Sequence, residues 1–168
     1  ESLGDHSVIE PGDLHWTQAG SGIVHEETPS RPGQPANGLQ IFVNMARSHK
    51  QDPAAVFKVA RQAMPVWEAG GVRVKVAAGS LQGLSSPINA DARWATPVNL
   101  IDITLQPGAA FDLPVPQAHN GFLMVIAGSL NAGDHAARAQ QTVVLQPAQP
   151  GSAGVGVLPL RAGDDGAH

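Results

Sequence analysis

The chain has 168 residues, of which 14 are acidic and 10 are basic, so its formal net charge is -4. An acidic surplus opposes binding to a phosphate backbone, and we therefore expect no nucleic-acid partner. The sequence contains no cysteine, which excludes disulfides, thiolate metal sites and cysteine nucleophiles. It also lacks an apolar run of about 18 residues and a charged leader before a short apolar block, so we expect no membrane partner and a cytoplasmic protein.

Turn-forming residues are frequent, with 19 Gly and 14 Pro, whereas charged residues make up only 14% of the chain. Long exposed helices need runs of Glu, Lys, Arg and Leu, which are absent here. The composition therefore favours an all-β protein. Length alone leaves one domain or two small halves open.

The first part of the chain predicts short strands separated by turns. Residues 7–10 and 14–17 flank the Pro11-Gly12-Asp13 turn, a pattern typical of a hairpin. Residues 23–27 follow a glycine-rich bend. In residues 39–44, the apolar Leu39, Ile41 and Val43 occupy every second position and would form one apolar face. We expect both to be core strands. Residues 45–71 lose this alternation, so we expect a linker with one helical turn.

The second part of the chain is richer in strand patterns. Strict alternation over residues 72–77 and 100–105 predicts two half-buried strands. Further strands are predicted over 111–115, 121–126, 142–145 and 155–158, with a turn at 127–129. The polar residues 163–168 are expected to fray. Short strands spaced by Gly and Pro turns are typical of a barrel or a sandwich.

His25 and Glu27 are the candidate site residues. They stand two apart in an expected strand, and side chains at that spacing leave the same face, so an imidazole and a carboxylate would converge. A transition metal bound by protein usually takes three or four such ligands, so this pair is half of a site. The alternative interpretation is a polar strand face without a metal. Glu26 is expected to point to the opposite face, into solvent.

Residues 11–27 combine a Pro-Gly-Asp turn, Trp16, a Gly20-Ser-Gly-Ile23 bend and a His25-Glu-Glu27 segment. This combination resembles the signature of the pirin family, and the resemblance continues from Ser2 to Leu145. It implies an all-β, pirin-type bicupin, which consists of two double-stranded β-helix barrels in tandem. We accordingly expect residues 1–70 to form the C-terminal part of the first barrel plus a linker, and residues 71–168 to form the second barrel.

The resemblance also implies one Fe²⁺ in the first barrel, held by three His and one Glu. His25 and Glu27 would be the third His and the Glu, and Glu27 would also act as the catalytic base. The other two ligands belong to a His-x-His motif, which this sequence does not contain. We therefore expect a chain truncated at both ends, with two incomplete barrels and weakened iron affinity.

Three functions follow from the resemblance. The first is flavonol oxidation of the quercetin 2,3-dioxygenase type by the full-length form, with a flavonoid as substrate. The second is a non-enzymatic, iron-dependent regulator that binds a protein partner, and the third is an inactive partial chain. An incomplete barrel exposes strand edges, so we also expect self-association.

Three other residues invite a functional interpretation. The family carries a non-ligand residue at the position of His15, and its second barrel holds no metal, so we expect none at His119. Trp16 is expected to pack in the core, because a buried indole is common when its N–H finds a partner.

Overall fold

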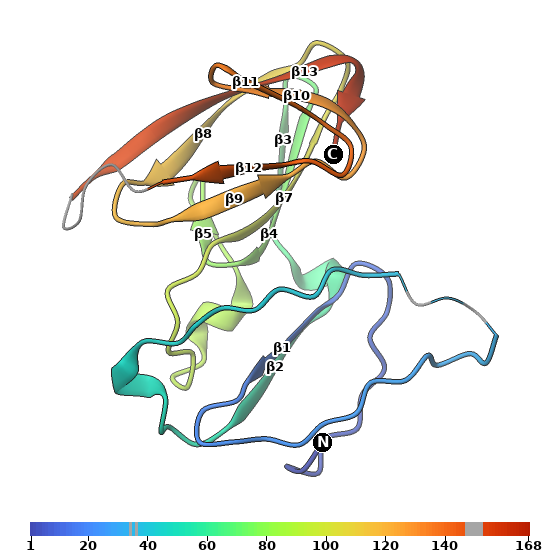
Figure 1. Ribbon diagram of the computed structural model, residues 1–168, viewed down its shortest axis with the longest axis vertical. Coiled ribbons are helices and arrows are strands. Elements are labelled where there is room, and N and C mark those ends of the chain that lie inside the picture. Colours follow the sequence, from blue (N-terminus) through green and yellow to red (C-terminus); the bar gives the residue numbers. More distant parts are fainter. Residues whose placement is uncertain (34, 36, 147–152) are drawn as a thin grey trace.

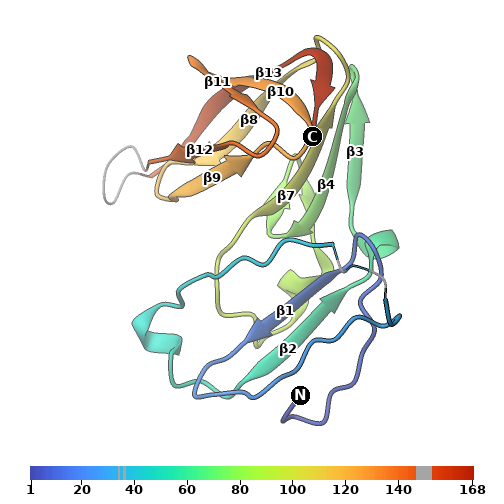
Figure 2. The ribbon, with the colours of Figure 1, turned by 45° about the vertical axis from the view of Figure 1, so that its right-hand side comes forward.

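The computed structural model describes residues 1–33, 35, 37–146 and 153–168. Its described elements are β-strands and short 3₁₀ helices, in agreement with the all-β prediction (Figure 1). They form two lobes along the long axis of the molecule (Figures 1 and 2). We define the N-terminal lobe as residues 1–65 and the C-terminal lobe as the strands from β3 onward. A loop over residues 86–99 packs between the lobes.

The N-terminal lobe is built on a two-stranded antiparallel sheet. Its strands are β1 (Leu14–Gln18) and β2 (Ala55–Val59). The 3₁₀ helices η1 (Arg47–His49) and η2 (Arg61–Ala63) flank β2, and η3 (Pro87–Ala90) lies in the inter-lobe loop. On β2, Ala55, Phe57 and Val59 are buried. They form a small core with the C-terminal end of β4 (Val72–Ala78), which belongs to the other lobe, and with η3.

The C-terminal lobe contains a seven-stranded antiparallel sheet in the order β11-β10-β13-β7-β4-β3, with β8 also paired to β13. The strands of this sheet are β3 (Val66–Ala69), β4 (Val72–Ala78), β7 (Leu100–Leu105), β8 (Ala110–Pro116), β10 (Gly128–Ala132), β11 (His135–Arg138) and β13 (Val155–Ala167). Two smaller two-stranded sheets accompany it: β9 (Gly121–Met124) with β12 (Thr142–Leu145), and the hairpin of β5 (Ser80–Leu81) with β6 (Leu84–Ser85).

The core of this lobe follows from the alternation of β4. Val72, Val74 and Val76 point inward, whereas Arg73 on the other face remains exposed. The paired strands β9 and β12 cover the core from the opposite side, because Leu123 and Val143 pack against it. Successive side chains of a strand leave opposite faces, which is why one pattern in the sequence supplies both a core face and a solvent face.

The predicted strands of the second half are confirmed, and β7 has the predicted bounds. The tail was predicted incorrectly: β13 continues through Ala167, which pairs with Leu105, and the His168 N–H donates to the Ala127 carbonyl at 3.0 Å. Partners from distant parts of the chain order this polar tail. Strands β10 and β11 were not predicted, and β10 begins at Gly128, inside the expected turn.

The first half departs further from the prediction. Residues 7–10 form no strand, and the hairpin expected there is replaced by pairing of β1 with β2. Residues 23–27 and 39–44 are not strands either, because the described part of the chain provides no strand beside them. The expected linker 45–71 holds β2 and β3. The domain boundary near residue 70 stays a prediction.

Candidate functional site

The candidate site lies in the extended segment that leaves β1 and ends at η1. Between described residues, no backbone–backbone hydrogen bond involves residues 25–45. Upstream of these, the Ser2 N–H donates to the Val24 carbonyl at 2.7 Å, and the Ser21 N–H donates to the Asp52 carbonyl at 2.9 Å. The segment is therefore anchored just before His25 and again at η1.

His25 and Glu27 point to the same side, as predicted, although they do so from an irregular segment. His25 Nδ1 lies 3.7 Å from Glu27 Oε1, and the two side chains are 35% and 58% exposed. An imidazole nitrogen and a carboxylate oxygen are donors that suit ferrous iron. Both are open to a ligand that arrives from solvent.

A metal site needs more donors than these two. Within residues 1–33, 35, 37–146 and 153–168, no group of three or more His, Asp or Glu side chains is arranged to hold a metal ion. The two side chains therefore fit part of a metal site. One imidazole and one carboxylate are the ligand types that the family resemblance implies. Glu26, between the two, is exposed, as expected.

His15 has a partner of its own. Its Nε2 lies 3.0 Å from Glu1 Oε1, and both side chains are about nine-tenths buried. Glu1 Oε2 and His15 Nδ1 have no hydrogen-bond partner in the described part of the chain. His15 therefore forms a buried polar pair with Glu1 and is not paired with His25.

Trp16 is half-buried and packs against the core of the N-terminal lobe, in agreement with the prediction. Its ring lies 4.9 Å from that of Trp94 in an edge-to-face arrangement, and Trp94 meets Phe57 in the same way at 5.3 Å. Aromatic pairs prefer this geometry. The inter-lobe loop that carries Trp94 is therefore fixed to β1 and β2.

Two arrangements were not anticipated from the sequence. His119, on the loop after β8, lines an open cleft of about 450 Å³ together with Trp94 and Asn99. These residues are too far apart in the chain for a spacing rule to join them. His49 Nδ1 lies 2.8 Å from Asp52 Oδ2, a second exposed pair of imidazole and carboxylate.

The family comparisons agree on one assignment. The family model described as Pirin matches residues 1–43, the part that contains His25 and Glu27. The chain is 34% identical over 125 residues to a pirin-like protein of Solanum lycopersicum, covering 74% of this chain and 41% of that protein. It is 33% identical over 130 residues to pirin of Homo sapiens, covering 77% and 43% respectively. These matches place the chain in the pirin family.

The pirin-family chain also resembles a solved structure across almost its whole length. Quercetin 2,3-dioxygenase from Acinetobacter baumannii superposes with a TM-score of 0.79 at 25% identity, covering 99% of this chain and 57% of that one. This similarity confirms the expected all-β, pirin-type bicupin fold. The chain spans less than half the length of the tomato and human relatives.

No described helix is long and apolar enough to cross a membrane.

Proposed function

We propose that this pirin-family chain supplies His25 and Glu27 as two ligands of an Fe²⁺ site, and that the site serves a dioxygenase acting on a flavonol. The observation that supports this most is the convergence of the two side chains, at 3.7 Å, inside the region matched by the family model. A solved relative in fold is named quercetin 2,3-dioxygenase, which supports the choice of substrate class.

Each residue has a distinct role in this proposal. His25 offers an imidazole nitrogen, which is a good ligand for iron. The Glu27 carboxylate accepts the proton of the flavonol hydroxyl group, becoming a neutral acid while the substrate becomes an anion. When bound, Fe²⁺ supplies the electron-transfer chemistry that O₂ needs in order to react with an organic molecule. The exposure of Glu27 leaves its carboxylate open to a substrate.

Anaerobic equilibrium dialysis against Fe²⁺, followed by elemental analysis, tests the ligand assignment. We expect His25→Ala and Glu27→Ala each to weaken binding by at least about tenfold, because each removes one donor of a small set. His49→Ala is the matched control, since His49 also faces a carboxylate with similar exposure but is not an expected ligand. Equal metal binding by the wild type and the His25 and Glu27 variants would overturn the assignment.

Oxygen uptake in the presence of quercetin tests the activity. We expect uptake by the iron-loaded full-length form, to which the family resemblance assigns the activity, and at least about a hundredfold lower rate for Glu27→Gln in that form, since general base catalysis contributes at that scale. Measuring the metal content of the same variant separates loss of the base from loss of iron. Iron-loaded wild-type protein that consumes no oxygen with quercetin would contradict the dioxygenase proposal and leave the ligand assignment standing.

A further inference from the structure

Two asparagines of this chain stand directly before a glycine, and the fold gives them different surroundings. They are Asn37, in the extended segment between β1 and η1, and Asn120, just before β9. The backbone nitrogen that follows an asparagine can attack the side-chain amide carbon, and glycine hinders this attack least because it has no Cβ. This chemistry is one reason why asparagine is a thermolabile residue. An Asn-Gly pair is therefore reactive wherever its backbone is free to move.

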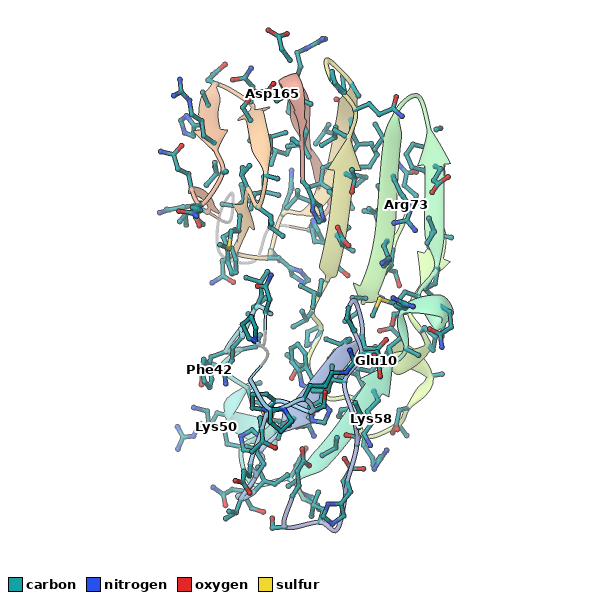
Figure 3. All side chains as sticks on the ribbon, turned by 90° about the vertical axis from the view of Figure 1, so that its right-hand side faces the viewer. Glu10, Phe42, Lys50, Lys58, Arg73 and Asp165 are labelled. Carbon is teal, nitrogen blue, oxygen red and sulfur yellow. The ribbon has the colours of Figure 1, made fainter. Side chains whose placement is uncertain are left out.

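The backbone around Asn37 is free to move. Between described residues, no backbone–backbone hydrogen bond involves residues 25–45, so the attacking nitrogen of Gly38 has no such partner there. Both residues are exposed, and nothing lies within 4 Å of the position that a Cβ on Gly38 would take. Figures 1 and 2 show the segment as an extended trace without a strand arrow, and Figure 3 shows Phe42, a few residues on, at the outer edge of the lobe.

The backbone around Asn120 is held on both sides. Gly121 is the first residue of β9 and pairs with Leu145 of β12 in the antiparallel register. On the other side of Asn120, the His119 N–H donates to the Pro116 carbonyl at 3.0 Å. Ring closure turns the peptide between Asn120 and Gly121, so it requires this end of β9 to open first.

We propose that Asn37 is a site of spontaneous deamidation in the folded chain and that Asn120 is protected from it. The Gly38 backbone nitrogen loses its proton and bonds to Cγ of Asn37, the Cγ–Nδ2 bond breaks, and ammonia leaves. Water then opens the resulting succinimide ring at either of its carbonyl carbons, which leaves an aspartate or an isoaspartate at position 37. The reaction uses only atoms of the chain and water, and nothing is oxidised or reduced.

Deamidation changes both the charge and the backbone of this segment. Residues 37–46 contain no Asp, Glu, Lys or Arg, so the new carboxylate is the only charged side chain among them. The isoaspartate product also adds a methylene group to the main chain just before the apolar residues Leu39 to Val43. The modification does not involve His25 or Glu27 and stands apart from the proposed function.

Incubation of the folded chain at neutral pH, followed by peptide mapping with mass spectrometry, tests the contrast between the two sites. We expect Asn37 to lose its amide at least about tenfold faster than Asn120, since only Asn120 must wait for a strand to open. In denaturing guanidinium chloride the two rates should converge, because both sites are then unstructured Asn-Gly pairs. Equal rates in the folded chain, or an unchanged ratio in denaturant, would overturn the proposal.

The variant Gly38→Ala tests the mechanism at Asn37. Position 38 has open space for a Cβ, and its φ lies outside the left-handed region, so the change adds no strain. We expect deamidation at Asn37 to slow by at least about tenfold, because the new methyl group hinders the attack, and the rate at Asn120 to stay the same. Asn37→Gln is the control that separates Asn37 from the nearby Asn44. An undiminished rate at Asn37 in Gly38→Ala, or an undiminished mass change in Asn37→Gln, would contradict the assignment.

Discussion

The two lobes differ in how completely their backbone and polar groups are partnered. The C-terminal lobe pairs its strands into a seven-stranded sheet and buries Val74 and Val76 completely. In the N-terminal lobe, the described residues pair only β1 with β2. Among the described residues, the buried side-chain atoms without a hydrogen-bond partner all lie in this lobe, on Glu1, His15, Thr17 and Gln18.

Apolar content does not explain this difference. Residues 39–43 place apolar side chains at every second position much as β4 does, but they remain exposed because no strand among the described residues lies beside them. An extended segment gains stability from cross-strand pairs and from burial of one face, and both depend on a neighbour. The comparison teaches that a strand pattern predicts a strand only where a partner is present.

Truncation of a leucine in each lobe should give the largest contrast. Leu160 on β13 is buried, whereas Leu39 is exposed. We expect Leu160→Ala to lower the free energy of unfolding by about 2–5 kcal/mol, because it leaves a cavity in a packed core. Leu39→Ala should change it by less than about 0.5 kcal/mol. Urea denaturation measured under conditions where the chain is monomeric checks both values, and similar losses would erase the distinction between the lobes.

Two glycines with the same backbone conformation give the next largest effect. Gly128 and Gly4 have φ of 75° and 80°, a region that a side chain makes strained. A Cβ at Gly128 would collide with the Gly166 carbonyl oxygen, whereas nothing lies near Gly4. We expect Gly4→Ala to cost about 1 kcal/mol and Gly128→Ala about 1–3 kcal/mol more. Thermal unfolding of the two variants measures the difference, and equal losses would show that β13 does not crowd Gly128.

Two buried hydroxyl groups give a smaller contrast. The Ser86 hydroxyl donates to the Ala77 carbonyl of β4 at 2.7 Å, whereas Thr17 Oγ1 in the N-terminal lobe has no partner in the described structure. We expect Ser86→Ala to cost about 1–2 kcal/mol and Thr17→Val to be neutral or stabilising, because only the first loses a hydrogen bond. Denaturant midpoints compare them. A clear loss of stability in Thr17→Val would mean that its hydroxyl does have a partner.

The smallest effect concerns an exposed ion pair on the inter-lobe loop. The side-chain hydrogen bond from Arg93 lowers the pKa of the Asp91 carboxyl from 3.8 to about 2. A carboxyl whose pKa is lower in the folded state stabilises the fold above pH 3.8, and this contribution is lost as the pH falls toward 2. We expect Arg93→Ala to return the pKa of Asp91 toward 3.8, which an NMR titration measures. An unchanged midpoint would show that Arg93 does not contact Asp91 in solution.

Much of the C-terminal lobe could be predicted from the sequence, because β4 and β7 alternate strictly and pair with each other. The tail could not, since Gly166 and Ala167 are ordered by distant residues rather than by any apolar pattern. Burial alternates along the five residues of β2. The sequence did not predict this strand, because Lys58 and the nearby Pro53 belong to a charged, proline-containing stretch. In the tail, tertiary context overrides the local pattern.

The candidate site also has one feature that the sequence predicts and others that it does not. The approach of His25 to Glu27 could be predicted from their spacing and occurs at 3.7 Å. Their exposure could not, because it depends on whether a neighbouring strand covers the segment. The pairing of His15 with Glu1 brings together the start of the chain and β1, a contact that no motif encodes.

Amide hydrogen exchange tests most directly the claim that the two lobes differ in how completely their backbone amides are hydrogen-bonded. It should be followed by NMR at a concentration where sedimentation shows a monomer. We predict that amides of β4 and β7 exchange slowly, since their hydrogen bonds lie in a packed sheet, and that amides of residues 38–44 exchange close to the rate of an unstructured chain. Protection of residues 38–44 comparable to that of β4 would contradict the account.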